Sequence, residues 1–177
     1  MVPGFEQFNT RIRTPGGFRL PLPPTERQWP TASGKAMFSV YGGVKEDADV
    51  FGGEHVLRLI TLRSHDQYNT TIYALDDRYR GVRGMRKVVF VNPHDISRLG
   101  FIPGQQVDLL SLWDDNIERK VCGFTLLAYD TPAGQAAAYY PETNPLVPLG
   151  SVGEASYTPT SKFIAIRLLA SAASNKV

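Results

Sequence analysis

The segment V-L-R-L-I-T-L-R-S-H-D-Q-Y-N-T-T, residues Val56 to Thr71, changes character halfway along its length. Up to Leu62 it is mostly apolar, as in a β-strand. From Arg63 on, almost every side chain is a hydrogen-bond donor or acceptor. A turn needs far fewer polar groups than this. The pattern therefore predicts a strand that is followed directly by a loop that binds a large polar ligand.

The composition is that of an ordinary globular protein. The chain has 177 residues, 42% hydrophobic and 20% charged, which is enough for one domain and an appendage. The net charge of +2 is too small to indicate nucleic acid or a membrane surface as a partner, and no apolar run approaches the roughly 20 residues of a membrane span. A single cysteine, Cys122, excludes an internal disulfide and a cysteine-built metal cluster. Because Cys122 lies in the apolar stretch 121–127, we expect it to be buried.

Residues 1–36 differ from the rest of the chain. They are rich in proline and arginine, and they carry the aromatic residues Phe5, Phe8, Phe18 and Trp29. Closely spaced prolines prevent a continuous helix and a central strand. We therefore expect an extended arm that docks onto this domain or onto a missing one. An unstructured tail is the alternative.

From Met37 on, short apolar runs bounded by Gly, Pro, Asn or Asp predict a mainly β domain. Asn92 and Pro93 suit the start of a short helix, and Gly100 suits its end. The polar run 114–116 is typical of a hairpin turn. Many short strands with one or two short helices favour a closed barrel. The expected strands are 36–40, 56–62, 87–91, 106–112, 120–129, 135–140 and 162–169.

Four motifs follow one another along the chain: S-G-K-A at 33–36, T-L-R-S-H-D-Q-Y-N-T at 61–70, N-P-H-D-I-S-R-L-G-F-I-P-G-Q-Q-V at 92–107 and Y-T-P-T-S-K at 157–162. In this order they resemble the C-terminal domain of molybdopterin-dinucleotide oxidoreductases, the family of formate dehydrogenases, periplasmic nitrate reductases and dimethyl sulfoxide reductases. The resemblance implies a double-psi β-barrel, aspartate-decarboxylase-like and with short helices, over residues 37–177. Residues 1–36 would then be the tail of a preceding domain that this chain lacks.

Segments 4–18, 71–86 and 136–144 are similar to formate-dehydrogenase-like alpha subunits. This implies a C-terminal domain of a larger molybdenum oxidoreductase that binds bis-molybdopterin guanine dinucleotide. Catalytic residues, the molybdenum ligand and any iron–sulfur cluster would lie in the missing domains, so we assign no catalytic and no metal residue here and expect no turnover by this chain alone. The expected partners are the preceding domains of the same polypeptide and electron-transfer subunits, and the expected location is the cytoplasm.

The polar loop supplies most of the candidate cofactor contacts. The Arg63 guanidinium suits a pyrophosphate or a pterin oxygen. Side-chain amides and hydroxyls suit the hydrogen-bonding edge of a pterin or guanine. His65 can donate or accept a hydrogen bond, and Lys162 can place a point charge near the pyrophosphate. The predicted cofactor-binding residues are Thr61, Arg63, Ser64, His65, Gln67, Tyr68, Asn69, Thr70, Asn144, Thr158 and Lys162.

Ordinary structural roles are open for several of these residues. Arg63 could form a surface ion pair with one of three carboxylates, those of Asp66, Asp76 and Asp77. Lys162 could be a lysine at the edge of a strand. The charged run 76–80 is either a solvated face or a surface that faces the active-site funnel or another domain.

The sequence also leaves other classes of protein and of site to consider. The spacings of His55, His65 and His94 match no usual zinc site. The alternative for the whole chain is a stand-alone double-psi barrel that serves as a decarboxylase-like enzyme, a binding module or a protein-interaction module. Tight retention of a guanine-containing pterin would favour the oxidoreductase domain over these.

Overall fold

The structure, a computed structural model, describes residues 4–38, 40, 52–153 and 156–171. Contacts divide the chain into two compact units, Met1–Asp47 and Ala48–Val177. The first unit contains the short helix α1 (Phe8–Arg11) and the 3-10 helix η1 (Pro23–Glu26). Its proline-rich segment thus forms η1, whose first positions suit proline because they need no backbone N–H.

An aromatic cluster organises the first unit. The rings of Phe5, Phe8 and Phe18 pack with centroids 5.4 to 6.1 Å apart. The Arg11 guanidinium lies 3.9 Å from the centre of the Phe18 ring, a cation–π contact. The expected extended arm thus contains two short helical turns, and three of its aromatic side chains pack on one another. That residues 1–36 are the tail of a preceding domain stays a prediction.

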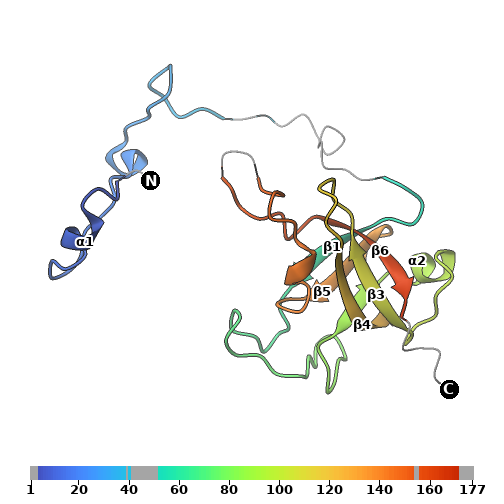
Figure 1. Cartoon of the computed structure of the whole chain (residues 1–177). Coiled ribbons are helices and arrows are strands. Elements are labelled where there is room, and N and C mark those ends of the chain that lie inside the picture. Colours follow the sequence, from blue (N-terminus) through green and yellow to red (C-terminus); the bar gives the residue numbers. More distant parts are fainter. Residues whose placement is uncertain (1–3, 39, 41–51, 154–155, 172–177) are drawn as a thin grey trace. The chain divides into compact units, whose positions relative to one another are not determined.

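Within the described residues, six strands of the second unit close into a barrel (Figure 1). Going round the barrel, the order is β1-β5-β2-β4-β3-β6. The pairs β1–β5 and β2–β4 are parallel and the other pairs are antiparallel. The strands are β1 (Leu57–Leu62), β2 (Val88–Val91), β3 (Gln106–Ser111), β4 (Arg119–Ala128), β5 (Gln135–Tyr139) and β6 (Ile164–Ala170).

This architecture confirms the predicted fold class, a mainly β, double-psi-like barrel with few short helices. Six predicted strands are found with ends displaced by at most two residues. The seventh, predicted over 36–40, is not formed by its described residues 36–38 and 40, and Ser39 lies outside the described part. A closed barrel leaves no free edge for a further strand.

Buried and partly exposed side chains alternate along β1, which connects the core with the polar loop after the strand. Leu57, Leu59 and Thr61 are buried, while the residues between them are partly exposed. Leu57 and Leu59 belong to the main hydrophobic cluster with residues of all the other strands. Thr61 is the next inward position, so the change from apolar to polar comes where the strand leaves the core.

The predicted helix is confirmed as α2 (Pro93–Arg98). The Asn92 side chain accepts a hydrogen bond from the His94 backbone N–H at 2.9 Å, which caps the first turn. Gly100, with φ +77°, takes the left-handed conformation after the helix. No helix among the described residues is long and apolar enough to cross a bilayer.

A bulge between β3 and β4 explains one wrong prediction. The strand register shifts beside Asp108, and Gly123, with φ +74°, donates its N–H to the Asp108 carboxylate at 3.1 Å. The bulge reverses the alternation of β4. Val121 therefore packs against the core, and Cys122, which we expected to be buried, is exposed.

Candidate functional site

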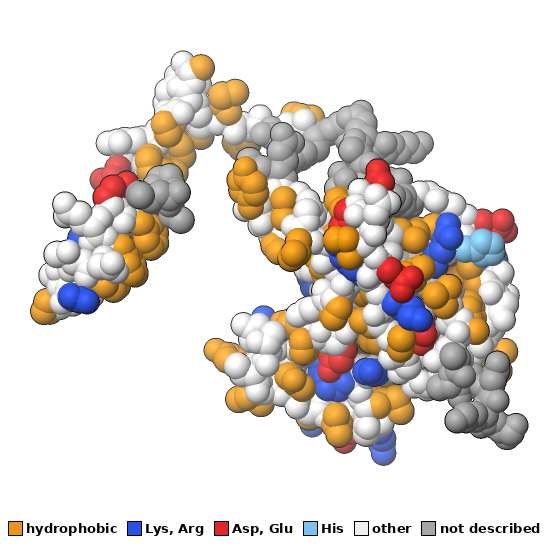
Figure 2. Space-filling view, viewed as in Figure 1, with side chains coloured by type: hydrophobic (Ala, Val, Ile, Leu, Met, Phe, Trp, Pro, Cys, Tyr) orange, Lys and Arg blue, Asp and Glu red, His pale blue; other side chains and the backbone are white. Residues whose placement is uncertain are grey.

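A pocket of about 830 Å³ lies where two loops leave one side of the barrel. One loop follows β1 and the other connects β5 with β6 (Figure 1). Figure 2 shows the surface of the barrel unit hollowed between them. The lining carries two cationic side chains and no carboxylate, and so favours an anion. The lining residues are Thr61, Leu62, Arg63, Thr70, Tyr140, Asn144, Val147, Pro148, Leu149, Pro159, Ser161 and Lys162.

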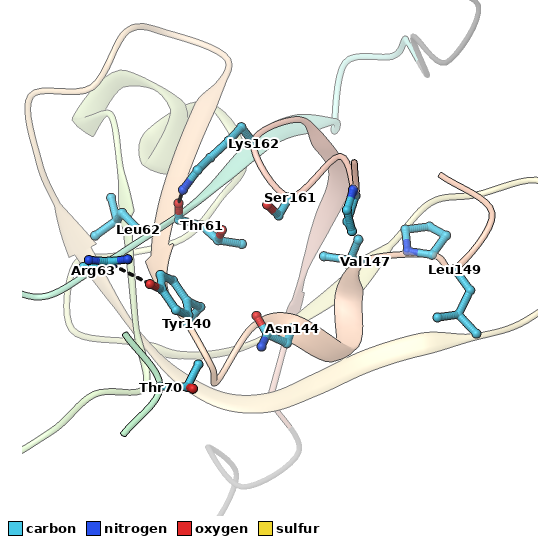
Figure 3. Close-up of a pocket in the computed structure, with 12 residues that line it drawn as sticks. Thr61, Leu62, Arg63, Thr70, Tyr140, Asn144, Val147, Leu149, Ser161 and Lys162 are labelled. Atoms are coloured by element: carbon cyan, nitrogen blue, oxygen red, sulfur yellow. Dashed lines mark hydrogen bonds between the residues drawn. The ribbon is translucent and has the colours of Figure 1, made fainter. Parts of the chain in front are cut away.

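The two cations stand on the same side of the pocket (Figure 3). The Arg63 side chain donates from Nε to the Tyr140 hydroxyl at 2.6 Å. Lys162 donates from Nζ to the carbonyl of Thr61. The Thr61 N–H in turn donates to the Ser161 carbonyl at 3.0 Å, which joins the end of β1 to the loop before β6. Arg63 and Lys162 are both exposed, so both charges can reach a ligand in the pocket.

The surface ion pairs that offered an ordinary role for Arg63 are not found. Asp66 lies 3.8 Å from Arg78, Asp76 accepts from the Gly84 N–H, and Asp77 binds other partners. Within the described part of the chain, Arg63 makes no ion pair. Lys162 lies before the first residue of β6, Ile164, and is therefore not a lysine at the edge of a strand.

The other side of the pocket is mostly apolar. Val147 and Leu149 lie there, with Asn144 between them and Tyr140 (Figure 3). Asn144 opens the 3-10 helix η3 (Asn144–Leu146), which buries Leu146 in the core. Leu149 is 95% exposed. The pocket thus combines positive charge on one side with an apolar surface on the other.

Behind the pocket wall lies a buried arginine that the sequence analysis missed. Arg86 is only 5% exposed. It donates from Nε and Nη2 to the Glu142 carboxylate at 2.6 and 3.2 Å. Nη1 donates to the Ser64 hydroxyl at 2.9 Å, and Nη2 to Gln67 Oε1 and the Tyr140 carbonyl, each at 3.0 Å. Arg86 therefore joins the start of the polar loop to the turn after β5.

Gln67 uses both ends of its amide inside this cluster. Its Oε1 also accepts from the Ser64 N–H at 3.1 Å. Its Nε2 donates to the carbonyls of Asn69 and Tyr140 at 2.7 and 2.9 Å. Ser64 and Gln67, both predicted as cofactor contacts, are buried and do not line the pocket.

A second buried cluster surrounds Asp77, which is 1% exposed. Its carboxylate accepts from Tyr139 Oη at 2.8 Å, from Arg80 Nη1 at 2.6 Å and from His65 Nδ1 at 2.9 Å. Burial raises the pKa of Asp77, but hydrogen bonds from Tyr139, Arg80 and His65 more than offset this, and the pKa falls to about 2. Burial and the Asp77 carboxylate raise the pKa of Tyr139, which stays protonated as a donor. The run 76–80 is therefore not simply a solvated face.

The pocket brings together five of the eleven predicted contacts: Thr61, Arg63, Thr70, Asn144 and Lys162. Ser64 and Gln67 are buried around Arg86, and His65, itself exposed, bonds to the buried Asp77, whereas Tyr68, Asn69 and Thr158 are exposed. None of these six residues lines the pocket. Tyr140 and Ser161 were missed, although each adjoins a predicted site or strand end. Among the described residues, no three His, Cys, Asp or Glu side chains are grouped as metal ligands.

The chain belongs to the family described as "Molydopterin dinucleotide binding domain", whose model matches residues 57–164. It is 53% identical over 173 residues to "Uncharacterized oxidoreductase Mb2924c" of Mycobacterium bovis and to "Uncharacterized oxidoreductase Rv2900c" of Mycobacterium tuberculosis. It is 39% identical over 171 residues to "Protein YdeP" of Escherichia coli (strain K12). Each alignment covers 95% of this chain and 22% of the relative, so the chain spans about a fifth of the length of these curated relatives.

Proposed function

We propose that this chain is the cofactor-binding domain of a larger molybdenum oxidoreductase and that its pocket binds molybdopterin guanine dinucleotide, within a bis-molybdopterin guanine dinucleotide site. The observation that carries the proposal is the pocket itself. It combines two cations, no carboxylate and an apolar wall in a family defined by binding of this type of dinucleotide.

The residues of the pocket fit the chemistry of that cofactor. Arg63 and Lys162 would offset the charge of a pyrophosphate. The Asn144 amide and the Thr70 hydroxyl match the donors and acceptors of a ring edge, and Val147 and Leu149 offer a surface on which a flat ring can pack. The bound cofactor would supply the redox chemistry, while these residues bind it, orient it and exclude water.

The remaining predicted contacts have two roles in this proposal. Ser64, His65 and Gln67 hold the loop in place. Tyr68, Asn69 and Thr158 are exposed, and we propose that they meet the cofactor or the rest of the polypeptide. None of these side chains is needed to explain the charge of the pocket.

A larger polypeptide is favoured over a stand-alone barrel because the relatives are far longer than this chain. In the proposal, residues 1–36 end a preceding domain, and the preceding domains hold the molybdenum ligand and an iron–sulfur cluster. Formate is the proposed substrate, on the similarity of segments 4–18, 71–86 and 136–144 to formate-dehydrogenase-like subunits. Electron-transfer subunits and a cytoplasmic location belong to the same proposal.

The substitution Arg63→Ala in the complete polypeptide tests the pocket. Loss of a charge-assisted contact is expected to weaken cofactor retention by roughly ten-fold. Retention is measured as molybdenum and acid-released GMP per polypeptide after dialysis, with circular dichroism as a check on folding. The matched control is Arg83→Ala, since Arg83 is exposed and does not line the pocket. Normal cofactor content in folded Arg63→Ala protein would contradict the assignment.

A further inference from the structure

We infer that Arg86 is the positioning residue of this pocket. It holds Tyr140, and through Tyr140 the guanidinium of Arg63, in the arrangement that binds the anion, without touching the ligand itself. The inference rests on the proposed function of the pocket, because it concerns how that same site is kept in shape.

The hydrogen bonds of Arg86 are all directed into the protein. The side chain does not line the pocket, and each of its three guanidinium nitrogens donates to a protein acceptor. On one side the acceptors are Ser64 and Gln67 of the polar loop, and on the other they are the Tyr140 carbonyl and the Glu142 carboxylate. Arg86 is therefore placed to fix the separation of the two loops that enclose the pocket.

Tyr140 links this buried cluster to the pocket. Its carbonyl accepts from both Arg86 and Gln67, at 3.0 and 2.9 Å. Its hydroxyl lines the pocket and accepts from Arg63 Nε at 2.6 Å. Ser64, which is bonded to Arg86, directly follows Arg63 in the chain. The backbone on both sides of the Arg63–Tyr140 contact is thus held by one guanidinium.

Only arginine can make this set of contacts. The planar guanidinium matches the Glu142 carboxylate with two bonds and still reaches four further acceptors, on Ser64, Gln67, Ala74 and Tyr140, whereas a lysine ammonium is a point charge. The rings of Tyr73 and Tyr139 lie with centroids 4.4 and 5.2 Å from the guanidinium carbon, which restricts its plane. The change Arg86→Lys therefore keeps the positive charge next to Glu142 and removes the planar set of N–H donors.

The ion pair alone is a weak explanation for this arrangement. A buried Arg–Glu pair is often no more stabilising than apolar residues of the same volume, because both charges lose their hydration. A geometric role explains why the same guanidinium also bonds the loop and the Tyr140 carbonyl. It also predicts an effect that a purely stabilising residue would not have, namely that the contribution of Arg63 depends on Arg86.

The test is a double-mutant cycle in the complete polypeptide with Arg86→Lys, Arg63→Ala and both together. Cofactor retention is measured as molybdenum and acid-released GMP, and folding by thermal unfolding. Each single change is expected to weaken retention by roughly five- to ten-fold. The double change should weaken it by no more than the larger single effect, because Arg86→Lys already removes most of the contribution of Arg63. Arg119→Lys is the matched control, because Arg119 is also paired with a carboxylate, that of Asp115, but lies outside the pocket lining.

The outcomes separate this inference from the proposed function. If Arg63→Ala leaves retention unchanged, the pocket is not the cofactor site and both fail. If Arg63→Ala weakens retention and the Arg86→Lys effect simply multiplies with it, the positioning role is overturned while the proposed function stands. If Arg86→Lys reduces the yield of folded protein, Glu142→Gln replaces it in the same cycle, and the same non-additivity is expected. Glu142→Gln removes the charge that anchors the Arg86 guanidinium and keeps the shape of the side chain at position 142.

Discussion

The pocket face and the buried face of the loop after β1 contain the same kinds of side chain but use them differently. On the buried face, Arg86 is 5% exposed, and its guanidinium is bonded to the protein through every nitrogen. On the pocket face, Arg63 is exposed and has one hydrogen bond to Tyr140, from Nε. The polar capacity of the loop is thus divided between groups that fix its shape and groups that remain for a ligand. The two faces should therefore respond differently to substitution.

The largest effect is expected for Asp77→Ala on the buried face. The change leaves the Tyr139 hydroxyl, Arg80 and His65 without their shared acceptor, and should lower the free energy of unfolding by about 3 kcal/mol. Urea unfolding of the full chain, followed by tryptophan fluorescence, measures it. The control is Asp66→Ala, since Asp66 is exposed and 3.8 Å from its partner, and its effect should stay within about 0.5 kcal/mol. Similar values for the two would remove the distinction between the faces.

The same carboxylate predicts a dependence of stability on pH. Because the folded pKa of Asp77, about 2, lies below the ordinary value of 3.8, the unfolded chain takes up the proton first as the pH falls. The stabilisation is therefore complete above pH 4 and is lost towards pH 2, by about 2 kcal/mol in total. The difference in unfolding free energy between the wild type and Asp77→Asn should shrink over this range. A difference independent of pH would show that Asp77 is not the group responsible.

A smaller effect is expected for Tyr139→Phe. This change removes one of the three side-chain donors to Asp77 and leaves the ring packing intact, so a loss of about 1 to 1.5 kcal/mol in unfolding free energy is expected. Tyr129→Phe is the control, because Tyr129 packs edge-on against the same ring of Phe90 but is 39% exposed. Equal losses would mean that the hydroxyl of Tyr139 adds nothing to the buried face.

The smallest effect on stability is expected for Arg63→Ala. The side chain is exposed and serves the pocket, so the unfolding free energy should change by no more than about 0.5 kcal/mol. The measurement uses the full chain without cofactor, so that binding does not contribute. A loss as large as that of Asp77→Ala would place Arg63 among the structural groups and would weaken the proposed function.

The fold was predictable because its signals are local. Each strand is a short apolar run with Gly, Pro, Asn or Asp at its ends, and the cap of α2 is visible as Asn92 followed by Pro93. The position of Cys122 needed one further clue. Gly123 interrupts an apolar strand, which is where bulges occur, and the bulge turns Cys122 outward.

Which side chains line the pocket and which ones fix the loop was not predictable, because the answer depends on contacts with residues far away in the sequence. Gln67 and Arg63 are both polar side chains of one loop, and only the fold shows that the Gln67 amide is bonded through both its oxygen and its nitrogen. Arg86 and Glu142 are 56 residues apart and lie in polar segments with no local pattern that marks them as partners. A sequence lists donors and acceptors, but the direction in which each one points depends on the barrel.

The pairing of β1 has a consequence for how the chain acquires its structure. Among the strands of the described residues, β1 comes first in the chain and pairs with β5 and β6, the last two of them to be synthesised. Contacts between such distant segments are slow to form, because closing the long intervening loop costs chain entropy before the contacts can stabilise it. Synthesis proceeds from the N-terminus, so β1 has no strand partner until β5 has emerged, and the barrel cannot close until β6, which ends at Ala170, has followed. Closure of the barrel is therefore a late event, and until then the apolar residues of β1 are available to chaperones and to aggregation.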